Sequence, residues 1–150
     1  MKPPDINLKF TIKTIDKTAR SIILIDDRAM NVKVPIDRRD DIVVQWTFTI
    51  PAGPDDIEIV ELKIYPQGSK QRAWPGNGGV LKSTTQGGSA ATASLSGKQW
   101  LQLVLDHNHM PKGRTAFTYD IVMSDKTTGR AMELVDVDPS MTLEPDGAYL

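Results

Sequence analysis

Apolar and polar residues alternate along the segment IVVQWTFTI, residues 42–50. Every second residue from Ile42 to Ile50 is apolar, with Trp46 at the centre, and most of the residues between them are polar. Side chains of an extended chain point alternately to opposite faces, so this period places one row on a core and the other toward water. The segment therefore predicts a half-buried β-strand, and the chain must fold so that a sheet covers a core.

The same period recurs in other segments, with two informative variations. INLKFTI (6–12) and AFTYDIVM (116–123) alternate regularly. In DDIEIVELKI (55–64) the apolar residues change phase, which one extra residue in a strand would cause, so we expect a β-bulge near Ile59–Val60. RSIILI (20–25) is continuously apolar and predicts a central strand covered on both faces.

Short turn signals rich in Gly, Pro, Asp and Asn separate these segments, and a helical period is hard to find. About eight or nine short strands with such punctuation indicate an all-β fold. We predict one domain over residues 1–150, an antiparallel two-sheet β-sandwich with a Greek-key connection. The predicted core consists of Leu8, Phe10, Ile23, Val44, Trp46, Phe48, Leu62, Leu103, Phe117, Tyr119 and Ile121.

The order of these landmarks resembles that of immunoglobulin-like and cupredoxin-like sandwiches. Trp46 lies in an early strand, and Tyr119 lies on the penultimate strand, where the tyrosine corner of Greek-key sandwiches would fall. The last strand ends DVDPSMTL, and the Asp138–Pro139 pair is similar to one in small bacterial sandwich proteins, a likeness that implies no activity. The chain lacks the immunoglobulin cysteine pair, because it contains no cysteine.

Composition excludes several classes of function. Lys plus Arg number 18 and Asp plus Glu number 19, so a nucleic-acid binder, which usually carries a basic excess, is not expected. No apolar run reaches the roughly 18 residues that span a bilayer. The start, MKPPDINLKF, lacks the apolar stretch of a signal peptide. We therefore expect a cytoplasmic protein, and a mature secreted form stays open as the alternative.

Both histidines lie in LDHNHMP, residues 105–111. On an extended chain, His107 and His109 would point to the same side, so two imidazoles could meet one ion with Asp106 as a further ligand. A blue copper centre needs a cysteine thiolate, which leaves zinc or cysteine-free copper as the divalent metal. The alternative is a polar connection between two strands, for which Asn, Asp and Pro are well suited.

The stretch YPQGSKQRAWPGNGG, residues 65–79, is the longest irregular segment. Its Tyr65 and Trp74, with Lys70 and Arg72, would suit a carbohydrate or small aromatic ligand, because an exposed ring offers a flat apolar face. The alternative is an anchor, in which Trp74 and Pro75 fold back and pin the loop to the sandwich.

Three aspartate pairs stand at predicted strand ends: Asp26–Asp27, Asp40–Asp41 and Asp55–Asp56. Calcium sites in sandwiches collect such carboxylates, but none of the pairs has the spacing of a calcium loop. Aspartate is also common in turns, and we interpret these pairs as turn residues.

No nucleophile elbow, phosphate-binding loop or dinucleotide motif occurs in the chain. The predicted function is therefore a non-enzymatic binding or assembly module, acting through loops and sheet edges on a protein partner or a second copy, or on a carbohydrate or small ligand. A metal-binding protein centred on His107 and His109 is the alternative, and a hydrolase is the third.

Overall fold

The structure is a computed structural model that describes residues 3–25, 30–53, 57–135 and 137–145. These residues form ten strands and a short 3-10 helix, and they contain no α-helix. The strands are β1 Ile6–Asp16, β2 Ser21–Leu24, β3 Asn31–Pro35, β4 Ile42–Ile50, β5 Ile57–Pro66, β6 Leu81–Gly88, β7 Gly97–Leu105, β8 Thr115–Asp125, β9 Arg130–Leu134 and β10 Ser140–Glu144. Between β7 and β8 lies the 3-10 helix η2, His107–His109. No helix in the described ranges is long and apolar enough to cross a membrane.

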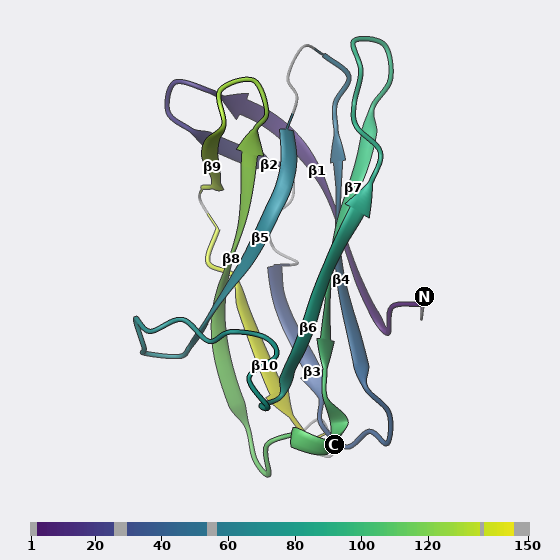
Figure 1. The fold of residues 1–150 in the computed structure, drawn as a ribbon, viewed down its shortest axis with the longest axis vertical. Coiled ribbons are helices and arrows are strands. Elements are labelled where there is room, and N and C mark those ends of the chain that lie inside the picture. Colours follow the sequence, from purple (N-terminus) through teal and green to yellow (C-terminus); the bar gives the residue numbers. More distant parts are fainter. Residues whose placement is uncertain (1–2, 26–29, 54–56, 136, 146–150) are drawn as a thin grey trace.

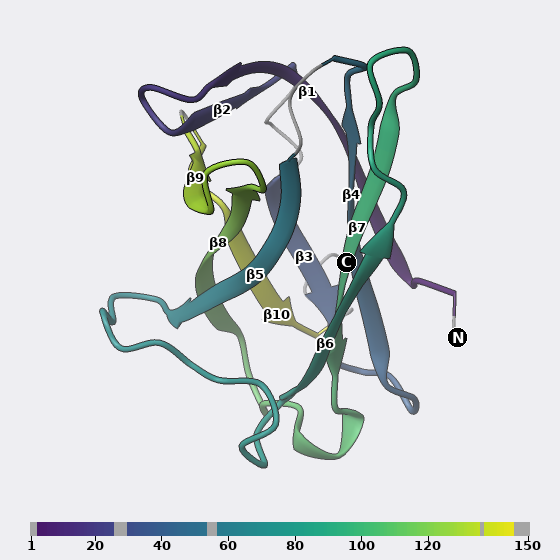
Figure 2. The ribbon, with the colours of Figure 1, turned by 45° about the horizontal axis from the view of Figure 1, so that its top comes forward.

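The strands lie in two layers that are joined through β1 (Figures 1 and 2). The first sheet contains the beginning of β1, followed by β4, β7 and β6. The second contains β8, with β5 along one edge and both β9 and β10 along the other, extended by β2 and β3. Strand β1 belongs to both, because residues 6–11 pair with β4 and residues 12–16 pair with β2.

The prediction of an all-β fold is confirmed, but the prediction of a strictly antiparallel sandwich is wrong. Three strand pairs are parallel: β1 with β4, β10 with β3, and β2 with β9. None of these pairs consists of neighbours in the sequence. The period of two assigns each residue to a face, but it does not specify which strand lies alongside or in which direction that strand runs.

The expected bulge is confirmed, because the register of β5 against β8 shifts between Ile59 and Glu61. The interpretation of residues 20–25 as a strand covered on both faces is wrong. Strand β2 alternates, with Ile22 buried, Ile23 half-buried and Ile25 64% exposed. Only one face of this part of the sheet lies against the core, so the outward side chains stay accessible.

The predicted core is buried with two exceptions, Ile23 and Leu8, which are both half-buried. Buried side chains of both sheets form one hydrophobic cluster, in which Phe10 stacks on Phe48 with ring centroids 5.4 Å apart. That the whole chain is one domain stays a prediction.

A hydrogen-bonded pair of aromatic side chains links the two layers. Trp46 on β4 is fully buried, and its Nε1 donates to the hydroxyl of Tyr119 on β8 over 3.0 Å. That hydroxyl in turn donates to the backbone carbonyl of Met30, just before β3. Tyr119 therefore does not form a tyrosine corner, in which the hydroxyl bonds to the backbone a few residues upstream in the sequence. It connects three segments of the fold instead, and burial raises its pKa.

The free edge of β5 is closed by side chains from the first sheet and by a loop. The buried side chain of Gln99 on β7 accepts from the Ile59 N–H (2.8 Å) and donates to the Ile57 carbonyl (2.7 Å). These two groups flank one residue, so the Gln99 amide takes the place of a neighbouring parallel strand. Gln86 on β6 donates to the Ile59 carbonyl over 3.0 Å. Further along, the Ala73 N–H donates to the Ile64 carbonyl over 2.8 Å.

Replacing Tyr119 by Phe should lower the free energy of unfolding by about 1–3 kcal/mol, because the Trp46 N–H and the Met30 carbonyl would lose a partner inside the core. Urea unfolding measures this difference. Tyr65→Phe is the control, since Tyr65 is only half-buried and should change stability by less than about 0.5 kcal/mol. Equal effects of the two variants would contradict the proposed link between the layers.

Candidate functional site

One side of the sandwich leaves two strand edges open. Over residues 6–11, β1 has β4 as its only strand partner among the described residues, and β3 likewise has only β10. At the end of this stretch of β1, the Thr11 carbonyl accepts from the Ile25 N–H over 3.0 Å, so the open edge covers residues 6–10. A cleft of about 650 Å³ lies between the start of β1 and the end of β3. It is lined by Asp5, Ile6, Lys33, Pro35, Asp37, Arg38, Arg39, Asp40, Asp41 and Ile42.

The floor of the cleft is the connection of residues 36–41, which crosses from the second sheet to the first. Its polar sequence, DRRDD at 37–41, suits an exposed connection after Pro35. Ile36 is buried, and its N–H donates to the Glu144 carbonyl over 3.1 Å, which holds the connection to the end of β10. The connection thus combines exposed polar residues that line the cleft with one buried apolar residue that holds it to the core.

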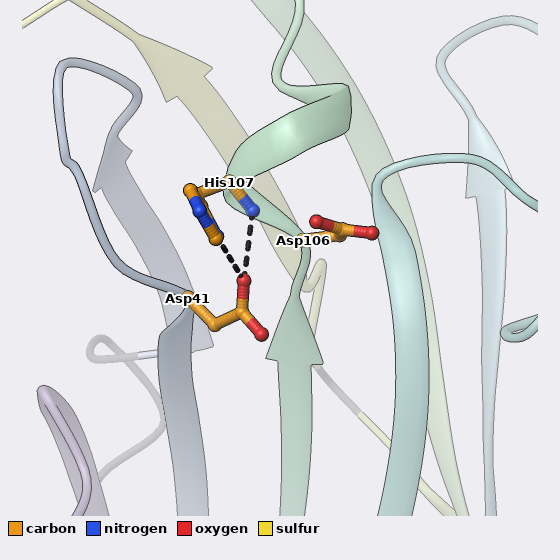
Figure 3. Close-up of side chains that lie close together, drawn as sticks. All are labelled: Asp41, Asp106 and His107. Carbon is orange, nitrogen blue, oxygen red and sulfur yellow. Dashed lines mark hydrogen bonds and ion pairs between the residues drawn. The ribbon is translucent and has the colours of Figure 1, made fainter.

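Asp41 fastens the other end of this connection to η2 (Figure 3). Its Oδ1 accepts from the backbone N–H of His107 over 3.0 Å and lies 2.5 Å from His107 Nδ1. Its Oδ2 accepts from Lys82 Nζ over 2.8 Å. One carboxylate thus joins the segments that precede β4, begin β6 and follow β7.

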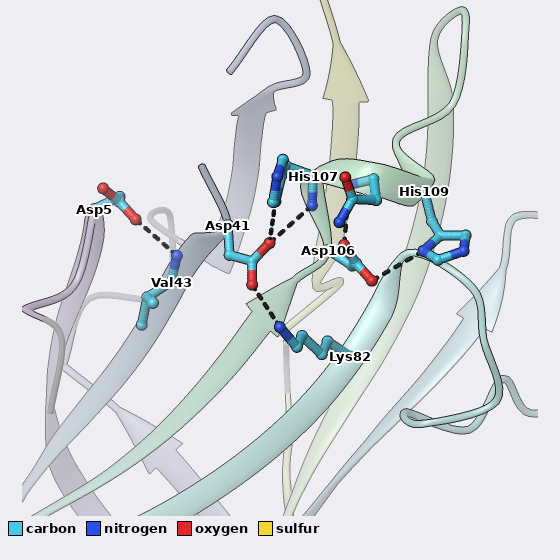
Figure 4. Close-up of polar contacts among 8 residues, drawn as sticks. Asp5, Asp41, Val43, Lys82, Asp106, His107 and His109 are labelled. Carbon is cyan, nitrogen blue, oxygen red and sulfur yellow. Dashed lines mark hydrogen bonds and ion pairs between the residues drawn. The ribbon is translucent and has the colours of Figure 1, made fainter. Parts of the chain in front are cut away.

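Asp5 fastens the start of β1 in a similar way (Figure 4). The Asp5 N–H donates to the Val43 carbonyl over 2.9 Å, and its Oδ2 accepts from the Val43 N–H over 2.8 Å. Two aspartates that line the cleft, Asp5 and Asp41, therefore hold the segments on either side of it by bonding to backbone groups.

A second carboxylate–histidine pair stands beside the first. Asp106 caps η2, because its Oδ1 accepts from the Asn108 N–H over 2.9 Å, and its Oδ2 lies 2.9 Å from His109 Nδ1. The hydrogen bond from the Asn108 backbone, aided by His109, lowers the pKa of Asp106.

Hydrogen bonds dominate the electrostatics of Asp41. Bonds from the His107 and Lys82 side chains, joined by one from the His107 backbone, hold the pKa of Asp41 far below its usual range. The pKa of Lys82 is raised by Asp41. Asp41 therefore stays ionised at neutral pH and binds an ammonium group at its second oxygen.

The geometry expected for the two histidines is wrong. Residues 107–109 form a 3-10 helix, so the chain is not extended there. His107 turns toward Asp41, whereas His109 turns toward Asp106. The turn forms because the side chain of Asp106 caps it, and a cap depends on local backbone geometry that strand periodicity does not reveal.

The structure does gather a different set of potential metal ligands. One ligand atom each from Asp41, Asp106 and His107 lies within 4.8 Å of the others (Figure 3). Asp106 and His107 belong to the predicted set, and Asp41 joins them in place of His109. Lys82 already supplies positive charge to this cluster, so an incoming cation would have to displace its ammonium group.

Of the four residues predicted to bind a ligand in the loop 65–79, the structure brings Arg72 and Trp74 together. Arg72 is held by Glu61 Oε2 and the Leu62 carbonyl, both at 3.1 Å, and its guanidinium lies 3.8 Å from the centre of the Trp74 ring. Trp74 is 55% exposed. Arg72 and Ala73 therefore attach the loop to β5, and Trp74 is not the anchor. Among the described side chains, no ring stacking or cation–π contact joins Tyr65 or Lys70 to Trp74. Ligand binding here stays a prediction.

Sequence reasoning missed three residues of the site: Asp5, Asp41 and Lys82. The interpretation of Asp40–Asp41 as turn residues did not predict the partners of Asp41. An aspartate directly before a strand can accept a hydrogen bond from a backbone N–H, as Asp41 does from His107. Lys82 gave no signal, because its partner lies 41 residues away in the sequence. The pairs Asp26–Asp27 and Asp55–Asp56 lie outside the described residues.

Comparison with known proteins adds little to this geometry. No protein-family model matches the sequence, and no curated protein matches it either. Among solved structures, the periplasmic chaperone SfaE is similar, with a TM-score of 0.44 and 12% sequence identity over 80% of this chain and 57% of that chain. This chain thus spans less than two thirds of that structure. A likeness this distant carries no function, and the site is interpreted from its own contacts.

Replacing Asp41 by Asn should lower the free energy of unfolding by about 1–2 kcal/mol at pH 7, because the charged hydrogen bonds to His107 and Lys82 weaken. The pKa of Asp41 is lower in the folded state, so its carboxylate stabilises the fold above about pH 4, and this contribution is lost as the pH falls. The difference between the proteins should therefore shrink below about pH 4 in urea titrations.

The neighbouring exposed residue offers a matched control for this measurement. Asp40→Asn removes the same charge one position away, and we expect it to change stability by less than about 0.5 kcal/mol. A pH-independent difference for Asp41→Asn, or an equal effect of Asp40→Asn, would show that Asp41 does not fasten the connection.

Proposed function

We propose that this protein is a non-enzymatic binding module that takes up an extended segment of a protein partner on the open side of the sandwich. The supporting observation is that two open strand edges, β1 over residues 6–10 and β3, flank a cleft of about 650 Å³. Strand addition to an open edge is a common way to recognise extended peptides, because backbone hydrogen bonds provide affinity for any sequence.

The contrast with β5 supports this choice of side. At the β5 edge, Gln99, Gln86 and Ala73 already bond to backbone groups, so an added strand would have to displace them. Proteins usually block edges that are not meant to pair. The open side has no such side-chain cover along residues 6–10 of β1 within the described parts of the chain.

The finer fold class is part of the same proposal. Two layers around a buried tryptophan are what an immunoglobulin-like Greek-key sandwich provides, and such sandwiches commonly present binding surfaces at their edges and loops. A hydrolase with a serine or threonine nucleophile is not favoured, because no hydroxyl of these residues bonds to the His107 imidazole among the described residues.

Selection from a displayed library of random linear peptides, about ten residues long like a long strand, tests the proposal. The full chain should select peptides that bind with a Kd below about 100 µM. In two-dimensional NMR spectra, a selected peptide should shift amide resonances of residues 5–11 and 31–42. Arg39→Glu, which reverses an exposed charge in the cleft, should weaken binding several-fold, whereas Lys98→Glu at the far end of β7 should not.

Two results would overturn this function. One is that no peptide binds in that range of concentration. The other is that the selected peptides shift resonances at the β5–β6 seam or the loop of Trp74 and leave the open side unchanged. Light scattering of the chain alone identifies self-association, which would make a second copy the partner.

A second candidate function is metal binding, favoured by the convergence of Asp41, Asp106 and His107. If these residues bind Zn²⁺, Lys82 competes with the ion. Zinc should then raise the melting temperature of the protein, and the rise should be larger in Lys82→Met and absent in His107→Ala. Nickel and copper serve as additional probes. A melting temperature that none of the three ions changes, in either the parent or Lys82→Met, would exclude this function.

A further inference from the structure

Burial along the inward row of β1 decreases toward the cleft. Ile12, which pairs with Leu24 of β2, is 1% exposed, and Phe10, which stacks on Phe48, is 4% exposed. Leu8 and Ile6 are only half-buried, although both pack against the core. The sequence thus carries apolar residues at two positions that the fold leaves partly uncovered.

The open edge explains this gradient. Phe10 and Ile12 are covered at the end of β1 that adjoins β2, where Ile12 pairs with Leu24 and the Ile25 N–H donates to the Thr11 carbonyl over 3.0 Å. Before Phe10, β1 has only β4 as a strand partner among the described residues. A side chain in a sheet is normally flanked by side chains of the strands on both sides. Leu8 and Ile6 lack such a flank on one side, so a further strand would complete their burial.

The edge of β3 has the opposite properties. Its inward residues Val32 and Val34 are already 3% and 0% exposed, so an added strand would gain little apolar burial there. Lys33 is exposed at the middle of the strand, and Pro35 at its end has no N–H to donate. An exposed lysine and a proline are the residues with which proteins discourage pairing at an edge.

Self-pairing through β3 is also disfavoured. If two copies of β3 paired antiparallel about the middle of the strand, Lys33 would lie directly opposite its own copy. Like charges in that position are destabilising. β1 is therefore the better of the two open edges for an added strand, and apolar residues at every second position of that strand would meet Ile6 and Leu8.

We propose that β1 is the docking strand, and that its ligand is an extended segment of another protein with apolar residues at every second position. The segment pairs along residues 6–10, its apolar side chains cover Ile6 and Leu8, and its end lies in the cleft beside residues 37–41. This inference rests on the proposed function and specifies the strand and the chemistry of the partner.

Hydrogen–deuterium exchange of the full chain with a library-selected peptide tests the choice of strand. Amide exchange within residues 6–10 should slow by at least about tenfold on binding, because new backbone hydrogen bonds protect these groups. Exchange within β3 should stay unchanged. A scrambled peptide of the same composition, with its apolar residues placed side by side, should bind at least about tenfold more weakly.

A pair of leucine variants tests the apolar contact. Leu8→Ala should weaken the binding of the selected peptide by about tenfold. Leu134→Ala is the matched control, because Leu134 on β9 is also half-buried against the core but lies away from β1 residues 6–11. If Leu8→Ala fails to fold, the exchange experiment on the unmodified chain still decides the question.

The outcomes separate the two proposals. Protection of β3 instead of β1, or equal binding by the scrambled peptide, overturns this inference and leaves the proposed function intact. Binding away from the open side, or no binding, overturns both. If the chain alone forms dimers that protect residues 6–10, the occupant is a second copy, and the inference of a different protein is wrong.

Discussion

The hydrogen-bonded contact between Trp46 and Tyr119 is the constraint on which the rest of the structure depends. It connects β4 in one layer with β8 in the other, and through the Met30 carbonyl it also holds the chain just before β3. Polar atoms of buried aromatic side chains need partners, so the two layers can pack in few other ways. That packing sets the position of β3 relative to the start of β1, which defines the open side.

The edges of β5 and β1, on two sides of the sandwich, differ in how far their backbone groups are already hydrogen-bonded. At the β5 edge, the buried Gln99 reaches across the interior and occupies the backbone groups that a new strand would need. At the other side, β1 keeps an open edge and two half-buried apolar residues. The cost of burying the Gln99 amide is offset because it satisfies backbone groups of β5, and this arrangement disfavours strand addition at the β5 edge.

The connection between β3 and β4 brings together the cleft and the histidines. Asp41 lines the cleft and binds both His107 and Lys82, so the segment that contains the histidines supports the wall of the site. Two carboxylate–histidine pairs meet at one turn, an arrangement that would invite a metal-site interpretation. The lysine bonded to Asp41 gives the cluster a structural explanation, because its ammonium group already balances the charge of this carboxylate.

The sequence by itself determined the strands over residues 6–12, 42–50 and 116–123, the inward rows around Trp46 and Tyr119, and the bulge after Ile59, because a period of two and its interruptions are local properties. Only the tertiary structure decided which strands are parallel, that Leu8 stays half-buried, and that Asp41 meets His107 and Lys82. These features depend on which distant segments become neighbours. Asp41 lies 41 positions from Lys82 and 66 positions from His107, and no local sequence pattern predicts contacts over such separations.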